Sequence, residues 1–136
     1  MLIGDNRERF DPEAFLSVAR RLNTPEASEA DFRTICGRAY YAVFLIADAQ
    51  LKLLPVSIST RDSHGGPHDK VIRQAKQRSA IVATLLMELR SIRIKADYVL
   101  TPTGPDLTYW RNQAQNALEL AGYLLPRVRH LGSSRR

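Results

Sequence analysis

The feature that most constrains the fold is an apolar pattern with helical spacing that runs from about Glu29 to Leu54. Ser28 precedes it as a helix cap, and Glu29 and Asp31 fall in the first turn, where the helix dipole favours negative charge. Two adjoining apolar stripes follow this segment, although a simple surface helix needs only one. The first stripe is Phe32, Ile35, Ala39, Ala42, Ile46, Ala49 and Leu53, and the second is Cys36, Tyr40, Val43, Ala47, Leu51 and Leu54. The pattern predicts either a central core helix or a helix with one face in the core and another in a dimer contact.

Helical spacing also marks the rest of the chain. The other predicted helices cover about 11–22, 68–76, 79–98 and 106–125. Asp11 is expected to cap the first of them with Pro12 at its first position, and Pro126 is expected to close the last. Since no alternating strand pattern is present, we predict an all-α fold, an up-and-down helical bundle of four main helices plus one short helix.

Length and composition bound the domain organisation. The 136 residues, 44% hydrophobic and 25% charged, predict one domain over 1–136, with a core at about 10–126 and a basic tail at 127–136. No apolar run approaches the ~20 residues of a membrane span, and the charged N-terminus is unlike a signal peptide. The single Cys36 cannot form a disulfide within the chain, which favours a reducing compartment. We therefore expect a cytoplasmic protein that does not enter a membrane.

The net charge of +6 favours a partner that carries phosphate groups, because such a partner releases counterions on binding. The alternative is a solvated basic tail, since part of the surplus lies near the C-terminus at Arg127, Arg129, Arg135 and Arg136. Charge alone leaves both interpretations open.

The predicted helix over 79–98 holds the strongest site signal. Its buried stripe changes from apolar to charged without changing face, in the order Val82, Leu86, Leu89, Arg93 and Asp97. Arg93 and Asp97 have the spacing of an ion pair within one helix, and Arg90 falls near Asp97 on the same side. The stripe indicates either a structural ion pair or a polar cleft in which Arg93 faces a phosphate and Asp97 orients it.

Arg38, Tyr40 and Tyr41 form a second constellation on the long helix. Two consecutive tyrosines cannot share a face, so one is expected inside and the other toward a cleft or a partner. A buried tyrosine hydroxyl needs a partner, for which Asp97 or Arg93 is a candidate. The plainer interpretation is core aromatics beside an arginine that extends to solvent.

Signatures of metal and nucleophile chemistry are weak. His64 and His68 flank a glycine pair, but two ligands make a poor metal site, and His68 is better explained as the start of the third helix. Cys36 sits among apolar neighbours and is expected to be an unreactive core residue. Phosphate-loop, nucleophile-elbow and zinc-protease motifs do not occur. We expect no metal and no cofactor.

The order of these segments resembles the HEPN family. Arg38-Ala-Tyr-Tyr-Ala-Val-Phe on a long helix is followed by His68-Asp-Lys-Val, by Arg93-Ile-Lys-Ala-Asp97-Tyr98 and by an alanine-rich last helix, from about Phe10 to Leu125. The resemblance implies a helical bundle that dimerises through the faces bearing the fourth helix. Many members are metal-independent ribonucleases in which four to six residues separate the Arg from the His. Others bind nucleotides, RNA or a nucleotidyltransferase partner, and many belong to toxin–antitoxin or phage-defence gene pairs.

The sequence departs from the catalytic pattern of that family. The positions where histidine is expected hold Lys95, Ala96 and Asp97 after Arg90, and Tyr98, Val99 and Leu100 after Arg93. An ionised Asp97 is a poorer general acid than histidine, and a tyrosine with a pKa near ~10 is a poor general base. The resemblance nevertheless makes Arg93, Asp97 and Tyr98 the candidate catalytic residues. The candidate residues for binding nucleic acid or nucleotide are Arg38, Tyr41, Arg90 and Lys95.

Three functions are consistent with this sequence. The first is a homodimer that binds RNA or a nucleotide in a shared cleft, as a toxin or the partner of one. The second is an active metal-independent endoribonuclease. The third is a non-catalytic helical adaptor that binds a nucleotidyltransferase-type protein and does not contact nucleic acid.

Overall fold

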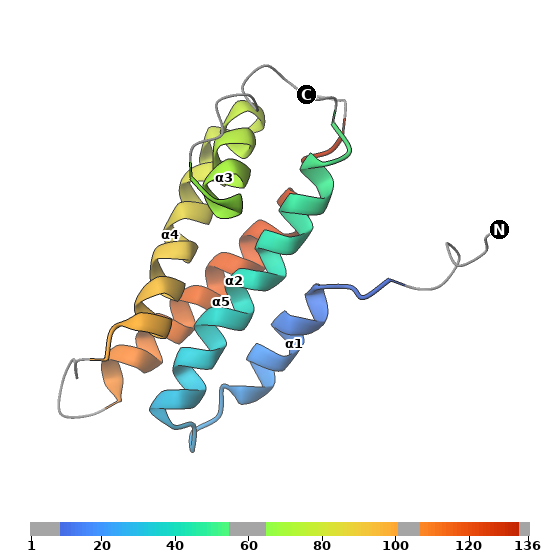
Figure 1. The fold of residues 1–136 in the computed structure, drawn as a ribbon. Helices are drawn as coiled ribbons and strands as arrows, with labels where there is room; N and C mark the ends of the chain where they lie inside the picture. The colour runs from blue at the N-terminus through green and yellow to red at the C-terminus, as the bar shows by residue number, and fades with distance from the viewer. Residues whose placement is uncertain (1–8, 55–64, 101–106, 134–136) are drawn as a thin grey trace.

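Five α-helices make up the fold in the computed structural model, which describes residues 9–54, 65–100 and 107–133 (Figure 1). In chain order they are α1 (Glu13–Leu22), α2 (Glu29–Leu51), α3 (Pro67–Arg78), α4 (Ala80–Tyr98) and α5 (Thr108–Val128). These residues contain no strand, so the predicted all-α helical bundle is confirmed. The shortest helix is α1 with 10 residues rather than α3, which extends over 12. Among the described helices, none has the length and apolar character needed to cross a bilayer.

Helix α2 lies at the centre of the bundle and contacts each of the other four helices (Figure 1). It begins with a capping box, in which Ser28 Oγ accepts from the Asp31 N–H at 3.1 Å and the Asp31 carboxylate accepts from the Ser28 N–H at 2.9 Å. Residues of both apolar stripes, such as Ile35 and Tyr40, are fully buried. Helix α2 is therefore a central core helix, as the first of the two predictions has it, although Tyr41 and Leu45 on one side of it remain only partly buried.

The end of α2 comes earlier than the predicted Leu54. The helix ends at Leu51, and the next residues form turns in which the Leu53 N–H donates to the Gln50 carbonyl at 3.1 Å. Leu53 is exposed, so burial does not hold this part of the chain in the helix.

The end of α5 comes later than predicted. Pro126 lies inside the helix, which continues to Val128. Proline keeps a helical φ and forfeits one N–H, here the donor to the Gly122 carbonyl. Val128 and Leu131 are both buried, and their burial holds the chain in place after the proline. The packed part of the chain thus reaches beyond residue 126, into the segment expected to be a basic tail.

Helix α1 is anchored at its beginning. The helix begins one residue later than predicted, with Pro12 rather than Asp11 as its N-cap, and the Glu13 N–H donates to Asp11 Oδ1 at 3.0 Å. Arg129, just after α5, donates from Nη2 to Asp11 Oδ1 at 3.1 Å and to Glu13 Oε1 at 2.7 Å. These contacts tie the start of α1 to the end of α5.

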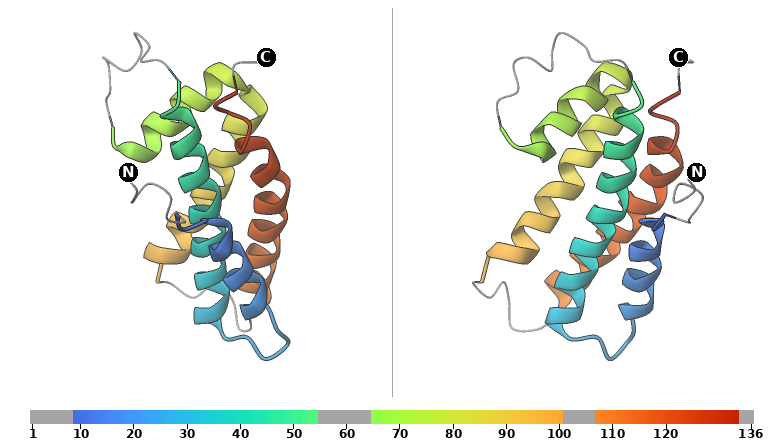
Figure 2. Two further views of the ribbon diagram at one scale, coloured as in Figure 1. Left: turned by 90° about the vertical axis from the view of Figure 1, so that its right-hand side faces the viewer. Right: turned by 45° about the vertical axis from the view of Figure 1, so that its right-hand side comes forward.

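Helices α3 and α4 meet at Ser79, which ends one and begins the other. Its hydroxyl oxygen accepts from the Val82 N–H at 3.2 Å. Because the chain turns back there, α3 lies beside the first part of α4 and also contacts α2 (Figure 2). The corner brings the start of α3 to the stretch of α4 where the buried stripe becomes polar.

An arginine from α2 holds the C-terminal end of α4. Arg33 Nη1 donates to the carbonyl oxygens of Ala96 at 3.0 Å and Val99 at 2.6 Å, and its Nε donates to Glu29 Oε2 at 2.9 Å. The guanidinium carbon lies 4.3 Å from the centre of the Trp110 ring on α5. This one side chain therefore joins α2, α4 and α5.

Candidate functional site

The stripe along α4 turns from apolar to charged at Arg93, as the spacing predicts. Leu86 and Leu89 are fully buried, and Arg93 is only 7% exposed. Asp97 lies one turn further on, with 41% of its side chain exposed. Arg93 Nη1 donates to Asp97 Oδ2 at 3.2 Å, which confirms the predicted pair. The pair consists of a buried cation and a carboxylate at the edge of the protein.

The guanidinium of Arg93 lies among aromatic rings. Its central carbon is 5.3 Å from the ring centre of Tyr40 and 5.3 Å from that of Tyr41. Burial is the largest influence on the pKa of Arg93 and acts to lower it, but the hydrogen bond with Asp97 and the charge interactions with Tyr41, Asp97 and Tyr40 together outweigh burial, so the pKa is raised and the group stays charged. Its Nε is buried without a hydrogen-bond partner in the described ranges. A buried polar group left unpaired typically costs about 1–3 kcal/mol, so this N–H is an unused donor.

Tyr40 and Tyr41 lie on different sides of α2, as predicted. Tyr40 is fully buried and Tyr41 is partly exposed. The hydroxyl of Tyr40 shares a hydrogen bond of 2.6 Å with Nδ1 of His68. The prediction that Arg93 or Asp97 would serve this hydroxyl is wrong, because the start of α3 places an imidazole there.

His68 joins this cluster, although the sequence suggested only a helix start. Its ring stacks on Phe44, with centroids 4.2 Å apart and 22° between the planes. Burial, and then the charges of Arg90 and Arg93, lower the pKa of His68 from its ordinary value of 6.5. Burial also raises the pKa of Tyr40. At neutral pH the imidazole is therefore uncharged, and in the tautomer that carries its proton on Nδ1, Nε2 is a free base.

Arg90 binds a carboxylate on α3 rather than Asp97. Its Nη1 donates to Asp69 Oδ1 at 2.7 Å. This bond, with a smaller contribution from the Gly66 N–H, lowers the pKa of Asp69. Gly65 has a φ of +85°, and a Cβ there would lie 2.5 Å from Asp69 Oδ2. Only glycine fits this position, so Gly65 allows the chain to enter α3 with His68 and Asp69 facing α4.

Of the remaining candidate residues, Arg38 lies beside Tyr41, whereas Lys95 and Tyr98 lie apart from the cluster. The guanidinium carbon of Arg38 lies 4.8 Å from the centre of the Phe15 ring and 5.5 Å from that of Tyr41. Lys95 and Tyr98 are exposed on α4, away from Arg93. The candidates that the structure brings together are Arg38, Tyr41, Arg90, Arg93 and Asp97.

One signal in the sequence could have found His68. Val71, Ile72 and Ala75 are the buried residues of α3. His68 precedes them by three, four and seven residues, so it belongs to the same helical stripe. A polar residue on a buried stripe is as informative on α3 as Arg93 is on α4. The partners of His68, namely Tyr40 and Phe44, come from another helix and carry no such signal.

Metal and thiol chemistry find little support. In the ranges that the structure describes, no group of three or more His, Cys, Asp or Glu side chains is placed to hold a metal ion. His64, considered above with His68, lies outside those ranges. Cys36 is fully buried, and burial, followed by the charge of Asp97, raises the pKa of its thiol to about 12. Cys36 is thus a protonated core residue, as predicted.

The cluster combines three chemical capacities at one place. Arg93 offers a fixed positive charge with an unused donor, Tyr41 offers a partly exposed ring, and His68 offers a neutral imidazole. Together they suit an anionic ligand that carries a flat aromatic group. Comparison with known proteins adds no relative, since no family model, no curated protein and no solved structure matches this chain significantly.

Proposed function

We propose that this chain is a HEPN-like protein that forms a homodimer and binds RNA or a nucleotide in a shared cleft around Arg93. The observation that carries the proposal is the buried guanidinium, whose Nε has no acceptor in the described ranges and whose carboxylate partner is partly exposed. A phosphate is an anion that arginine binds through a planar fork, so it can take over the position of Asp97. The ring of Tyr41 gives a face on which a base can stack.

The cellular role that we propose rests on the order of the sequence motifs. Arg38-Ala-Tyr-Tyr, His68-Asp-Lys-Val and the Arg93-to-Tyr98 segment occur in the order of the HEPN family. We therefore propose that the chain belongs to a toxin–antitoxin or phage-defence module. A nucleotidyltransferase-type protein is then a further candidate partner.

The outer face of α4 supports the proposed homodimer. Met87, Ile94 and Tyr98 are exposed, and their spacing of seven and four residues places them on one stripe. An exposed apolar stripe of this kind is typical of an interaction surface. Arg90 and Asp97 lie on the neighbouring side of the same helix, four and three residues from Ile94. A twofold contact along the stripe therefore brings two Arg93 clusters to one cleft.

His68 favours metal-independent endoribonuclease activity as a second candidate function. The sequence lacks the expected histidine on α4, but α3 supplies one whose Nδ1 is fixed by Tyr40 at 2.6 Å. In this candidate reaction the ribose 2′-hydroxyl attacks the adjacent phosphorus and passes its proton to Nε2 of His68. The bond from phosphorus to the 5′-oxygen breaks, and that oxygen takes a proton from water. Arg93 stabilises the charge on the phosphate.

Binding of labelled single-stranded RNA at low salt, followed by fluorescence anisotropy, tests the proposal. We expect binding that weakens steeply as salt rises, and a particle of twice the 15.3 kDa chain mass in sedimentation. Arg93→Lys keeps the charge but loses the fork, so it should weaken binding, whereas Arg111→Lys on the exposed surface of α5 should not. Absence of RNA binding together with a monomeric mass would overturn the proposal and favour the adaptor.

A further inference from the structure

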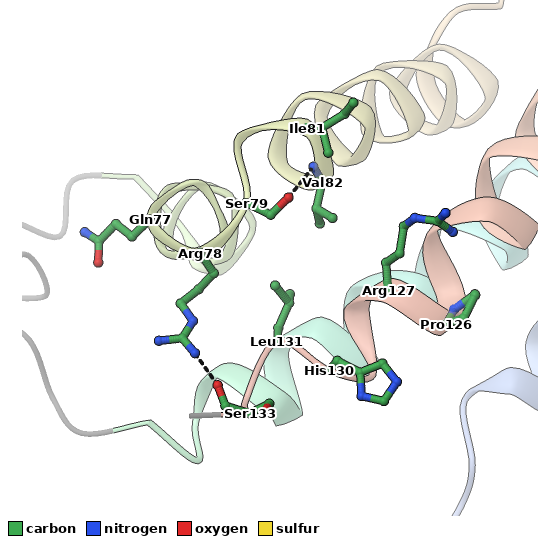
Figure 3. A pocket seen from close by; sticks show the side chains of 10 residues that line it. All are labelled: Gln77, Arg78, Ser79, Ile81, Val82, Pro126, Arg127, His130, Leu131 and Ser133. Atoms are coloured by element: carbon green, nitrogen blue, oxygen red, sulfur yellow. Dashed lines mark hydrogen bonds between the residues drawn. The ribbon is translucent and has the colours of Figure 1, made fainter. Parts of the chain in front are cut away.

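A groove lies at the other end of α4, between the corner that joins α3 to α4 and the end of α5 (Figure 3). Its volume is about 860 Å³. The lining residues are Gln77, Arg78, Ser79, Ile81, Val82, Pro126, Arg127, His130, Leu131 and Ser133. Arg93 is roughly 18 Å along α4 from Ile81 at the helical rise of about 1.5 Å per residue, so the groove is separate from the candidate site.

The wall of the groove that follows α5 is fixed to the rest of the fold. The Gly132 N–H donates to Gln50 Oε1 at 3.0 Å, and a Cβ on Gly132 would lie 2.6 Å from the Gln50 carbonyl oxygen. Leu131 is buried beside it, and Arg78 at the end of α3 donates from Nη2 to the Ser133 carbonyl. Glycine alone allows the chain to approach α2 this closely. The segment that follows α5 is therefore held in a fixed position and forms a defined wall of the groove.

The groove has a basic rim and an apolar floor. Arg78, Arg127 and His130 line it, and none of the lining residues that the structure describes is acidic. Arg127 is held in place, since its Nη1 donates to the Tyr123 carbonyl at 2.8 Å and its guanidinium carbon lies 3.6 Å from the centre of the Tyr123 ring. The side of the groove that faces a ligand therefore presents positive charge, with no competing carboxylate among its described lining residues.

Apolar side chains lie between these basic groups. Figure 3 shows Leu131 and Val82 pointing toward one another at the floor, and both are buried. Ile81 also lines the groove, at its edge: it points away from Leu131 in Figure 3, and 59% of its surface is exposed. An exposed isoleucine among arginines suits a ligand that has both an apolar side chain and carboxylates.

We propose that this groove binds an acidic amphipathic segment of a partner protein. An apolar side chain of that segment covers Ile81, and its carboxylates bind Arg78 and Arg127. Insertion of the apolar face of a peptide between two helices is a common mode of recognition, and the matching charges set the orientation. RNA is the less suitable occupant, because contacts with its phosphates would leave Ile81 exposed to water.

Selection of short random peptides displayed on phage, with the full native chain as target, tests this proposal. Enriched peptides are synthesised and titrated by calorimetry. We expect sequences that carry leucine, isoleucine, phenylalanine or methionine at helical spacing beside aspartate or glutamate. Ile81→Asp should weaken their binding about tenfold or more through lost burial and charge repulsion. This substitution preserves folding, because Ile81 is exposed in the first turn of α4, where aspartate is favourable.

Asn112→Asp is the matched control, since it adds the same charge at an exposed position near the start of α5, and it should leave peptide binding unchanged. Arg127→Ala should weaken binding several-fold and reduce its dependence on salt. The proposal is overturned if no acidic peptide is enriched, or if enriched peptides bind Ile81→Asp as tightly as the native chain. It is also overturned if single-stranded RNA, and no peptide, loses binding in Ile81→Asp and Arg127→Ala.

Discussion

Arg33 and Arg93 both lie near the C-terminal half of α4, and their surroundings differ in kind. Arg33 donates to two backbone carbonyls and to the Glu29 carboxylate, and its guanidinium stacks on Trp110. Arg93 donates to Asp97 at 3.2 Å, and its Nε is buried without an acceptor in the part of the chain that the structure describes. The first arginine uses its donors on the protein, while the second keeps one unused.

This contrast separates a structural role from a binding role. The partners of Arg33 belong to three helices, so its removal affects the joint between them. The partner of Arg93 is partly in water, so the protein gains less from the pair. We therefore expect stability to depend more on Arg33 and ligand binding to depend more on Arg93.

The largest effect is expected for Arg33→Met. The carbonyls of Ala96 and Val99 lose their donor, and the free energy of unfolding should fall by about 2–4 kcal/mol. Urea denaturation followed by circular dichroism measures the change. Arg111→Met is the control, because Arg111 is exposed and its guanidinium carbon lies 4.8 Å from the centre of the Phe32 ring. Equal losses in both variants would contradict the structural role of Arg33.

A smaller effect is expected for Asp97→Ala, which leaves the buried charge of Arg93 without its carboxylate. A fully buried pair typically loses about 3–5 kcal/mol when one partner is removed, but the exposure of Asp97 reduces this to about 1–2 kcal/mol. Replacing both residues, as Arg93→Met with Asp97→Ala, should recover most of the loss in urea denaturation. A double variant less stable than Asp97→Ala would show that Arg93 is a structural clamp like Arg33.

A still smaller effect concerns pH. The unfolded chain protonates His68 near pH 6.5, whereas the folded chain does so at lower pH because the pKa of His68 is lowered. Between these values the unfolded state binds more protons, so stability should fall as pH drops below about 6.5. His68→Gln, which keeps an acceptor for Tyr40, should flatten this decline in thermal unfolding. Asp69, whose pKa is also lowered, acts in a separate window near and below 3.8. An unchanged decline in His68→Gln would exclude His68 as its source.

The smallest change in stability is expected for Arg93→Lys. The charge beside Asp97 remains, so the free energy of unfolding should change by less than about 1 kcal/mol. RNA or nucleotide binding should nevertheless weaken, because lysine lacks the planar fork. Thermal unfolding and anisotropy on the same samples separate the two quantities. Lower stability with unchanged binding would assign Arg93 to the same class as Arg33.

The sequence predicts those features that depend on spacing within one helix. The burial of Arg93 and its pairing with Asp97 follow from steps of three and four residues along α4. The bond between Tyr40 and His68 joins residues 28 positions apart on two helices, and no periodicity relates them. Pro126 shows a second limit, because burial of the residues after it outweighs the local preference of proline to end a helix.

Helix α3 buries just Val71, Ile72 and Ala75, far fewer residues than α2. A helix with so little buried surface is suited to open as a unit while the rest of the bundle stays packed, and its amide protons then exchange through that opening. Each opening would carry His68 away from Tyr40 and Asp69 away from Arg90. The closing of α3 and the assembly of the side-chain cluster around Arg93 are therefore governed by the same equilibrium. A ligand that bridges α3 and α4 would slow hydrogen exchange in α3 in proportion to its affinity for the closed state.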